Sequence, residues 1–193
     1  MSESERETRK RRIDPKLRAL NPPWDIVPFS HSLDFSSLDN VAVEEYPTAN
    51  GPVDYALFVK GKLLGMIEAK KVSTAPGNVL DQAKRYSQGA DNCAFSVNEP
   101  TPIYGDNFKV PFLYSTNGEL IYFEDVRERH YYSREISNFH TPDALYEAYI
   151  TDKTQSIDSL LNNTPNFDKL RYYQKDAIVS VEQAISKGKR KML

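Results

Sequence analysis

Three charged residues interrupt two apolar stretches in residues 53–71, "VDYALFVKGKLLGMIEAKK". Asp54 lies near the beginning of the first stretch, and Glu68 and Lys70 lie near the end of the second. Burying a charged side chain within an apolar strand is costly unless the charge is paired or binds a metal ion. These three residues are therefore the first candidates for chemistry in this chain.

The spacing of the three residues predicts that they meet. The two apolar stretches join at Lys60-Gly61-Lys62, which predicts a β-hairpin, and a three-residue loop there places Asp54 opposite Glu68. Directly opposed residues have Cβ atoms about 4.5–5.5 Å apart. Two carboxylates that close repel each other unless a divalent cation lies between them. Lys70 points to the same face as Glu68 because side chains alternate along a strand.

This arrangement is suited to hydrolysis of a phosphodiester. Asp54 and Glu68 would hold Mg²⁺, with the backbone carbonyl of Ala69 as a third ligand. The ion would lower the pKa of a bound water and neutralise charge on the phosphate. Lys70 would orient that water or stabilise the pentavalent transition state. The alternative is an ordinary solvent-facing pair of Glu68 and Lys70, because Asp followed later by Glu-x-Lys is a common pattern.

The composition is that of a soluble globular protein, with 193 residues of which 39% are apolar and 27% charged. No apolar stretch approaches the roughly 20 residues needed to span a bilayer. The N-terminus, "MSESERETRKRR", lacks the apolar region of a secretory signal. Cys93 is the only cysteine, which excludes an internal disulfide and a multi-cysteine zinc site. We therefore expect a cytoplasmic protein with no membrane partner.

Other catalytic classes receive no support from the sequence. His31, His130 and His140 lie far apart without the spacing of metal ligands, so structural or surface roles are expected for them. No Gly-x-Ser-x-Gly motif surrounds Ser115, so a serine hydrolase is not indicated.

The net charge of −2 hides an uneven distribution. Residues 1–20 carry seven basic and four acidic side chains, and residues 166–193 carry seven basic and three acidic ones. Between them, residues 21–165 carry eleven basic and twenty acidic side chains. A DNA-binding domain that acts alone usually has a basic face. Binding of nucleic acid must therefore depend on local charge, a bound metal ion or partner subunits.

Turn signals and apolar periodicity outline the elements. We expect a charged helix within residues 3–20, interrupted or ended near Asp14-Pro15, then a strand at 41–46 and, after the first hairpin, a helix around 78–88. A second hairpin is predicted over residues 110–126, where Asn117-Gly118 is the strongest signal for a two-residue turn.

The C-terminal part is predicted to contain two helices. The first lies in residues 140–150, with Thr141 as N-cap and Pro142 at the first helical position. Residues 151–166 are polar and are predicted to form a linker. Apolar residues then recur at helical spacing between residues 170 and 185.

Three segments together resemble a known nuclease family. They are "GPVDYALFVKGKLLGMIEAKK", "DQAKRYSQ" and "VPFLYSTNGELIYFEDV". The sequence resembles the N-terminal nuclease domain of the R (restriction) subunit of type I restriction-modification enzymes, which belongs to the PD-(D/E)xK nuclease superfamily. The resemblance implies catalytic roles for Asp54, Glu68 and Lys70, a restriction-endonuclease-like core, and Mg²⁺ as cofactor.

The resemblance also implies supporting residues. Gln82 and Tyr86 match the family's Gln-x-x-x-Tyr motif, which supports the site or contacts the DNA backbone; alternatively Tyr86 is a buried tyrosine with a polar neighbour. The first helix of the family carries an acidic residue near the site, and Glu5 in "SERETRKRRIDPKL" is the best match. "LRYYQKDAI" resembles the segment before the ATP-binding loop of superfamily 2 helicase-like motors, where Gln174 would bind adenine.

These inferences combine into one hypothesis. The predicted fold class is α/β, a mixed and mainly antiparallel sheet flanked by helices, with a nuclease domain at 1–150, a linker at 151–166 and a truncated motor-domain start at 167–193. The implied function is cleavage of double-stranded DNA without sequence preference, after ATP-driven translocation by the rest of the enzyme. The implied partners are the modification and specificity subunits. The alternative is a nuclease-fold module that no longer cuts and serves as a docking or scaffold domain between motor and DNA.

Overall fold

The computed structural model describes residues 3–74, 80–90, 102–127, 133–151 and 169–186. The chain divides into two compact units, Met1–Tyr149 and Ile150–Leu193. The second unit contains helix α6 (Tyr172–Ser186), which confirms the helix predicted there. Most of the predicted linker, as well as Cys93 and His130, lies outside the described residues. Among the helices that are described, none has the length and apolar character required to cross a bilayer.

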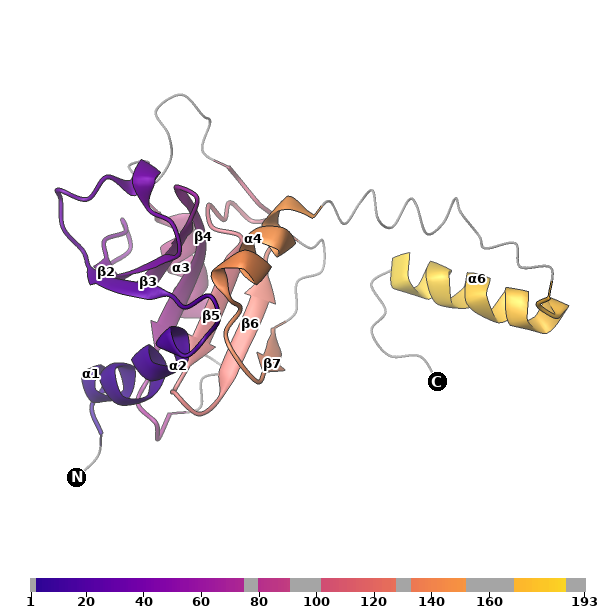
Figure 1. Cartoon of the computed structure of the whole chain (residues 1–193), viewed down its shortest axis with the longest axis horizontal. Helices are drawn as coiled ribbons and strands as arrows, with labels where there is room; N and C mark the ends of the chain where they lie inside the picture. The colour runs from indigo at the N-terminus through magenta and orange to yellow at the C-terminus, as the bar shows by residue number, and fades with distance from the viewer. Residues whose placement is uncertain (1–2, 75–79, 91–101, 128–132, 152–168, 187–193) are drawn as a thin grey trace. The chain divides into compact units, whose positions relative to one another are not determined.

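The first unit is built on one sheet of seven strands in sequential order (Figure 1). Its strands are β1 (Asp25–Pro28), β2 (Val41–Tyr46), β3 (Val53–Val59), β4 (Lys62–Ala69), β5 (Phe112–Thr116), β6 (Ile121–Asp125) and β7 (Arg134–Ile136). Strands β1 and β2 pair in parallel, as do β4 and β5, and the other four pairs are antiparallel. The predicted mixed, mainly antiparallel α/β fold is confirmed.

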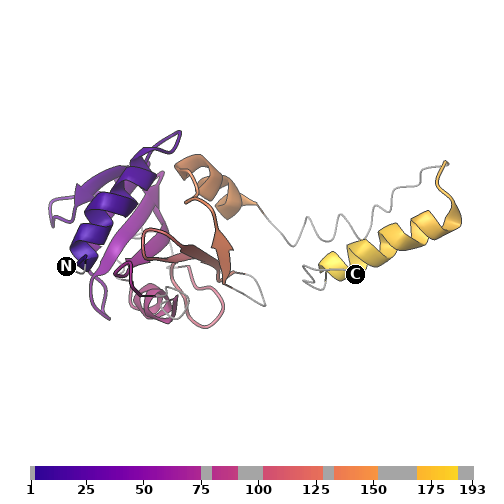
Figure 2. The same ribbon diagram turned by 90° about the horizontal axis from the view of Figure 1, so that it is seen from below.

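Helices cover both faces of the sheet (Figure 2). The helices of this unit are α1 (Glu5–Thr8), the π-helical η1 (Arg9–Ile13), α2 (Asp14–Arg18), the 3₁₀ turn η2 (Phe35–Ser37), α3 (Leu80–Gln88) and α4 (Pro142–Ile150). We call α1, η1 and α2 together the N-terminal helix. It lies with α4 on one face, and α3 lies on the other.

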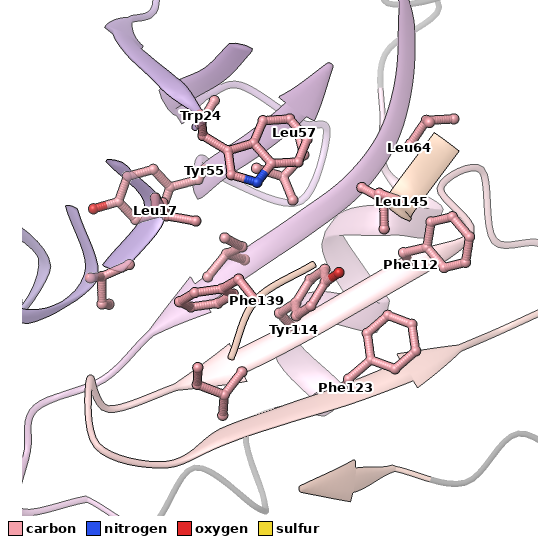
Figure 3. Close-up of a cluster of buried hydrophobic side chains, with 14 of the residues drawn as sticks. Leu17, Trp24, Tyr55, Leu57, Leu64, Phe112, Tyr114, Phe123, Phe139 and Leu145 are labelled. Atoms are coloured by element: carbon pink, nitrogen blue, oxygen red, sulfur yellow. The ribbon is translucent and has the colours of Figure 1, made fainter. Parts of the chain in front are cut away.

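Each face of the sheet buries its own apolar core. The core under the N-terminal helix and α4 is drawn in Figure 3, and its members include Leu17, Trp24, Tyr55, Leu57, Leu64, Phe112, Tyr114, Phe123, Phe139 and Leu145. The core under α3 includes Ala56, Phe58, Met66, Leu80 and Ala83. Residues of β3 thus alternate between the two cores, as expected of a strand that is buried on both faces.

The ends of the predicted helices agree with the structure. The N-terminal helix starts with a capping box in which Ser4 and Glu7 bond each other's backbone N–H. Its π-helical stretch ends directly before Asp14-Pro15, and the helix continues to Arg18. Thr141 accepts a hydrogen bond from the Ala144 N–H, which confirms its predicted role as N-cap of α4.

The loop of the first hairpin is shorter than predicted. Val59 pairs with Lys62, so the loop consists of Lys60 and Gly61 alone and the predicted three-residue loop is wrong. Both residues have positive φ, 49° and 70°, as in the type I′ turn that suits the twist of a two-residue hairpin. A β-carbon on Gly61 would lie 2.4 Å from the carbonyl oxygen of Ser36.

A β-bulge restores the predicted register further along the hairpin. Phe58 pairs with Leu63 but Leu57 pairs with Gly65, so Leu64 is an extra residue in β4. Beyond the bulge, Tyr55 pairs with Ile67, and the same register continued by one residue places Asp54 opposite Glu68. The short loop and the bulge therefore cancel before the hairpin reaches its charged residues.

The second hairpin has a longer loop than Asn117-Gly118 predicts. Thr116 pairs with Ile121, which leaves the four residues 117–120 in the loop. The Asn117 side chain explains the difference, because its Oδ1 accepts hydrogen bonds from the N–H groups of Glu119 and Leu120, at 3.0 and 2.9 Å. An asparagine that bonds backbone groups ahead of it stabilises a turn of this wider kind.

The same loop joins the N-terminal helix to the segment after β4. Asn117 Nδ2 donates to the carbonyl oxygens of Val72 and Thr74, at 3.1 and 3.2 Å. Arg12 of the N-terminal helix lies over Gly118, and its guanidinium lies 3.1 Å from Glu119. These contacts fix both segments that border the end of the first hairpin.

The close approach of Arg12 to Gly118 can be tested by adding one methyl group. Gly118 has φ of 84°, and a β-carbon there would lie 2.6 Å from Arg12 Cβ. We expect Gly118→Ala to lower the free energy of unfolding by about 1–3 kcal/mol, measured with urea, because of backbone strain and this clash. Glu119→Ala, which removes only the exposed ion pair with Arg12, should change it by less than about 0.5 kcal/mol. Equal losses in the two variants would contradict the explanation.

Candidate active site

The structure brings Asp54, Glu68 and Lys70 together at one end of the first hairpin. Ala56 and Met66 pack in the core under α3. Glu68 follows Met66 by two residues and so lies on that same face of β4. Regular alternation in β3 ends before Asp54, because Val53 as well as Ala56 packs in this core, and Arg9 of the N-terminal helix contacts the Asp54 carboxylate. The charge of Asp54 raises the pKa of Glu68, so the two carboxyls lie close together. The Nζ of Lys70 lies 2.7 Å from Glu68 Oε1, so these two side chains also share a face. Their predicted proximity is therefore present in the fold.

Backbone and charged groups surround the two carboxylates. Asp54 Oδ2 accepts a hydrogen bond of 2.7 Å from the Ala69 N–H, which joins the two strands beside the acids. Asp54 Oδ1 lies 2.9 Å from Nη1 of Arg9, in the N-terminal helix. Glu68 is only 4% exposed. Glu68 is thus buried and Asp54 partly buried, and the alternative of an ordinary solvent-facing Glu68–Lys70 pair does not fit the burial of Glu68.

Burial and mutual repulsion perturb both acids. Burial, and then the charge of Asp54, raise the pKa of Glu68 to about 7, although Lys70 opposes the shift. The pKa of Asp54 is also raised, by burial, against the Ala69 N–H and the charge of Arg9. Both acids therefore hold their protons more tightly than exposed carboxyls do. A buried acid pair of this kind is typical of functional sites, because a stable core would avoid it.

Glu5 lies within electrostatic range of this group. Its negative charge is among the causes that raise the pKa of Glu68. For Lys70, burial lowers the pKa, but the hydrogen bond and charge of Glu68, followed by the charge of Glu5, raise it overall. The N-terminal helix thus brings the acidic residue suggested by the sequence close to the hairpin.

The ligand types at the hairpin fit a hard divalent cation. Mg²⁺ prefers oxygen ligands and commonly takes one or two carboxylates, completing its shell with phosphate oxygens and water. Within the described residues, no group of three or more His, Cys, Asp or Glu side chains could hold a metal ion. An ion at this site would therefore use Asp54 and Glu68, with the Ala69 carbonyl, phosphate or water as its other ligands.

Gln82 and Tyr86 lie on α3 and bond to each other. The Nε2 of Gln82 donates to the Tyr86 hydroxyl at 2.7 Å, and the Tyr86 ring packs against the core under α3. Within the described part of the chain, no hydrogen bond or ion pair joins either residue to Asp54, Glu68 or Lys70. The geometry here is that of a partly buried tyrosine with a polar neighbour, the alternative weighed above.

The remaining predicted residues lie elsewhere. Gln174 is on α6 of the second unit, where its side-chain oxygen accepts a hydrogen bond of 3.0 Å from the Arg171 N–H. His140 bonds the buried Tyr114 hydroxyl at 2.7 Å, which confirms a structural role. His31 packs edge-on against Phe29.

Sequence reasoning missed Arg9 as a member of the site. Its guanidinium lies between Asp54, at 2.9 Å, and Glu45, at 2.5 Å. One signal in the sequence is the excess of basic residues near the N-terminus, although nothing in it distinguishes Arg9 from its neighbours. The "EE" at positions 44 and 45 within a predicted strand was a second, unused signal, because both acids need cationic partners; Glu44 pairs with Lys10 and Glu45 with Arg9.

The raised pKa of Glu68 predicts a pH-dependent cost in stability. Between the ordinary pKa of 4.5 and about 7, the folded chain binds more protons than the unfolded chain, so this residue makes stability fall as pH rises. Glu68→Gln removes the titration. Its free energy of unfolding relative to the original chain should therefore increase from pH 5 to pH 8, by about 1 kcal/mol or more.

Urea unfolding in the presence of a chelator measures this difference. Groups that titrate in both proteins largely cancel in the comparison. A difference between the two proteins that stays constant over this pH range would show that Glu68 is not perturbed by burial.

Comparison with known proteins identifies relatives that include this hairpin. The family described as "Type I restriction enzyme EcoKI endonuclease subunit second domain" matches residues 28–149. The type I restriction enzyme EcoKI endonuclease subunit of Escherichia coli (strain K12) is 31% identical over 192 residues. The match covers 80% of this chain and 16% of that subunit. No solved structure matches.

The family match contains Asp54, Glu68 and Lys70 together with all seven strands except the first residues of β1. The chain spans only about a sixth of the length of its relative, 16%. From the extent of the family match, we conclude that this chain belongs to the family of type I restriction enzyme endonuclease subunits.

Proposed function

We propose that residues 1–150 form the metal-dependent nuclease domain of a type I restriction enzyme and cleave double-stranded DNA. The observation that carries the proposal is the pair of Asp54, which is partly buried, and Glu68, which is buried, on adjacent strands, with Lys70 bonded to Glu68. Family membership supports a role in a restriction enzyme. The pair supports the finer statement, because a fold gains no stability from opposing two buried acids.

The residues have distinct roles in this proposal. Asp54, Glu68 and the Ala69 carbonyl would hold Mg²⁺, which when bound lowers the pKa of a coordinated water and offsets charge on the phosphate. The Ala69 N–H orients the Asp54 carboxylate. Lys70 is held by Glu68 and keeps further N–H donors for the attacking water or for the oxygens of the pentavalent phosphorus.

Gln82 and Tyr86 act less directly. We propose that they support the site through α3 or contact the DNA backbone, with their mutual hydrogen bond holding both side chains in place. Lys84, on the same helix, lies 2.9 Å from the buried Glu124 of β6 and ties α3 to the sheet. Glu5 would add negative charge near the ion.

In this proposal, other parts of the complete enzyme deliver the DNA to the hairpin. We propose that residues 151–166 are a linker and that 167–193 begin an ATP-dependent motor, in which Gln174 contacts adenine. Translocation by that motor, and target choice by the specificity and modification subunits, would deliver DNA to the hairpin in the cytoplasm. The acidic middle of the chain supports this division, because affinity for DNA depends mainly on neutralising phosphates.

One observation favours the second candidate, a docking module that no longer cuts. Arg9 neutralises Asp54 through a contact of 2.9 Å, as in an ordinary structural ion pair. Binding of Mn²⁺ separates the candidates, because a nuclease site must bind the ion and lose it in Glu68→Ala, whereas a docking module has no need of it.

Separate activities of the complete enzyme test the proposal. Asp54→Ala, Glu68→Ala and Lys70→Ala should each lower DNA cleavage by at least about 100-fold, because each removes a charged group from the reacting centre. ATP hydrolysis and translocation should remain intact, since the hairpin belongs to the first unit. The neighbouring exposed Lys71 is the matched control, and Lys71→Ala should retain cleavage.

Two outcomes would contradict this assignment. A well-folded Lys70→Ala enzyme that loses ATP hydrolysis would show that the hairpin serves the motor. Normal cleavage by Glu68→Ala would show that the reacting centre lies elsewhere.

A further inference from the structure

Arg9 lies between acidic side chains of two adjacent strands. Its Nη2 is 2.5 Å from Glu45 Oε1 of β2, and its Nη1 is 2.9 Å from Asp54 Oδ1 of β3. The Arg9 side chain is 12% exposed, so this cation is largely removed from water. A buried guanidinium requires acidic partners, and here one of the partners is a proposed metal ligand.

Glu45 is placed for this contact by an irregularity in β2. Glu44 pairs with Tyr55 and Tyr46 pairs with Val53, so the register places Glu45 opposite Asp54, yet those two residues do not pair. Glu45 has φ of 53°, a strained conformation for a residue with a side chain. Such strain tends to persist at functional sites, where surrounding contacts impose it.

The contact between Arg9 and Asp54 is not an ideal one. Although the charged atoms are close, Arg9 Nε and Nη1 are buried without a well-aligned hydrogen bond. A bidentate pair with two aligned N–H bonds would be much stronger. Arg9 therefore holds Asp54 mainly by charge, and a stronger cation can replace it.

Arg9 has a second acidic partner, Glu45, with which it can stay paired when it leaves Asp54. The Glu45 side chain is 54% exposed, whereas that of Asp54 is 19% exposed, so Glu45 lies toward solvent. The helix itself is anchored to the sheet elsewhere, by the ion pair of Lys10 with Glu44 of β2 and by Asp14, which accepts a hydrogen bond of 2.6 Å from the Tyr55 hydroxyl of β3. Arg9 can thus release Asp54 while it remains paired with Glu45 and the helix stays in place.

We propose that Arg9 is the counter-ion of Asp54 which a divalent cation must displace, so that the N-terminal helix sets the metal affinity of the site. The inference depends on the proposed function, in which Asp54 and Glu68 hold the ion. A guanidinium and a divalent cation both attracted to Asp54 repel each other, and each therefore weakens the binding of the other. If Arg9 instead orients Asp54 for the metal ion, then removal of Arg9 should weaken the binding of the ion.

Titration of the chain with Mn²⁺, followed by electron paramagnetic resonance, tests this inference without DNA. Arg9→Gln should bind Mn²⁺ about fivefold or more tightly than the original chain, within the usual range of coupling between two sites. Arg9→Lys keeps the positive charge, so its affinity for Mn²⁺ should stay within about twofold of that of the original chain. Thermal melting shows whether each variant is folded.

Arg12→Gln is the matched control. Arg12 lies on the same helix and also pairs with two acids, Glu3 and Glu119, each at 3.1 Å, but neither belongs to the site. Its removal should leave the affinity for Mn²⁺ unchanged. A gain equal to that of Arg9→Gln would attribute the effect to the helix as a whole and overturn the specific role of Arg9.

The remaining outcomes separate this inference from the proposed function. If Glu68→Ala abolishes binding but Arg9→Gln leaves the affinity unchanged or weaker, the site stands and the role of Arg9 is overturned. If neither the original chain nor Arg9→Gln binds Mn²⁺ while both are folded, the proposed function and the inference fail together. The gain in Mn²⁺ affinity seen in Arg9→Gln must also disappear in the double variant Arg9→Gln/Glu68→Ala. If the gain persists there, the ion binds elsewhere and the inference is overturned.

Discussion

The constraint on which the site depends is the burial of two acids on neighbouring antiparallel strands. Asp54 and Glu68 repel each other, and their burial raises the pKa of both. The fold offsets that cost with the Ala69 N–H, Lys70 and Arg9. Ala69 and Lys70 lie together at the end of β4, whereas Arg9 comes from the N-terminal helix, so the hairpin and that helix must both be in position. The two acids therefore cost stability, and in the proposed function this cost is offset by metal binding and catalysis.

Much of this arrangement could be predicted from sequence because it is local. Asp54 and Glu68 belong to one hairpin, where alternation and an approximate loop length determine which residues share a face. The loop was predicted incorrectly, and only the bulge at Leu64 returned the acids to register. Gly65, next to the bulge, was an unused signal, because a glycine inside a strand often marks a bulge. The apolar pattern gave no further signal, because a strand buried on both faces is apolar throughout.

The unpredicted features depend on tertiary contacts. Strands β1 and β7 have four and three residues, and edge pairing rather than composition makes them strands. The Asn117 loop widens because its side chain also bonds Val72 and Thr74, far away in sequence. The contact of Arg9 with Asp54 could not be predicted for a similar reason. The packing of the N-terminal helix determines which of its several basic residues reaches Asp54.

In the proposed function, Asp54 and Glu68 together bind one divalent cation. The most direct measurement is anomalous diffraction from crystals of the chain that have been soaked in Mn²⁺. We expect one strong peak bonded to oxygens of both carboxylates, at about 2.0–2.3 Å, and no such peak at this position in Glu68→Ala. A folded hairpin with Mn²⁺ bound elsewhere, or with both acids in place and no peak at saturating Mn²⁺, would contradict the account.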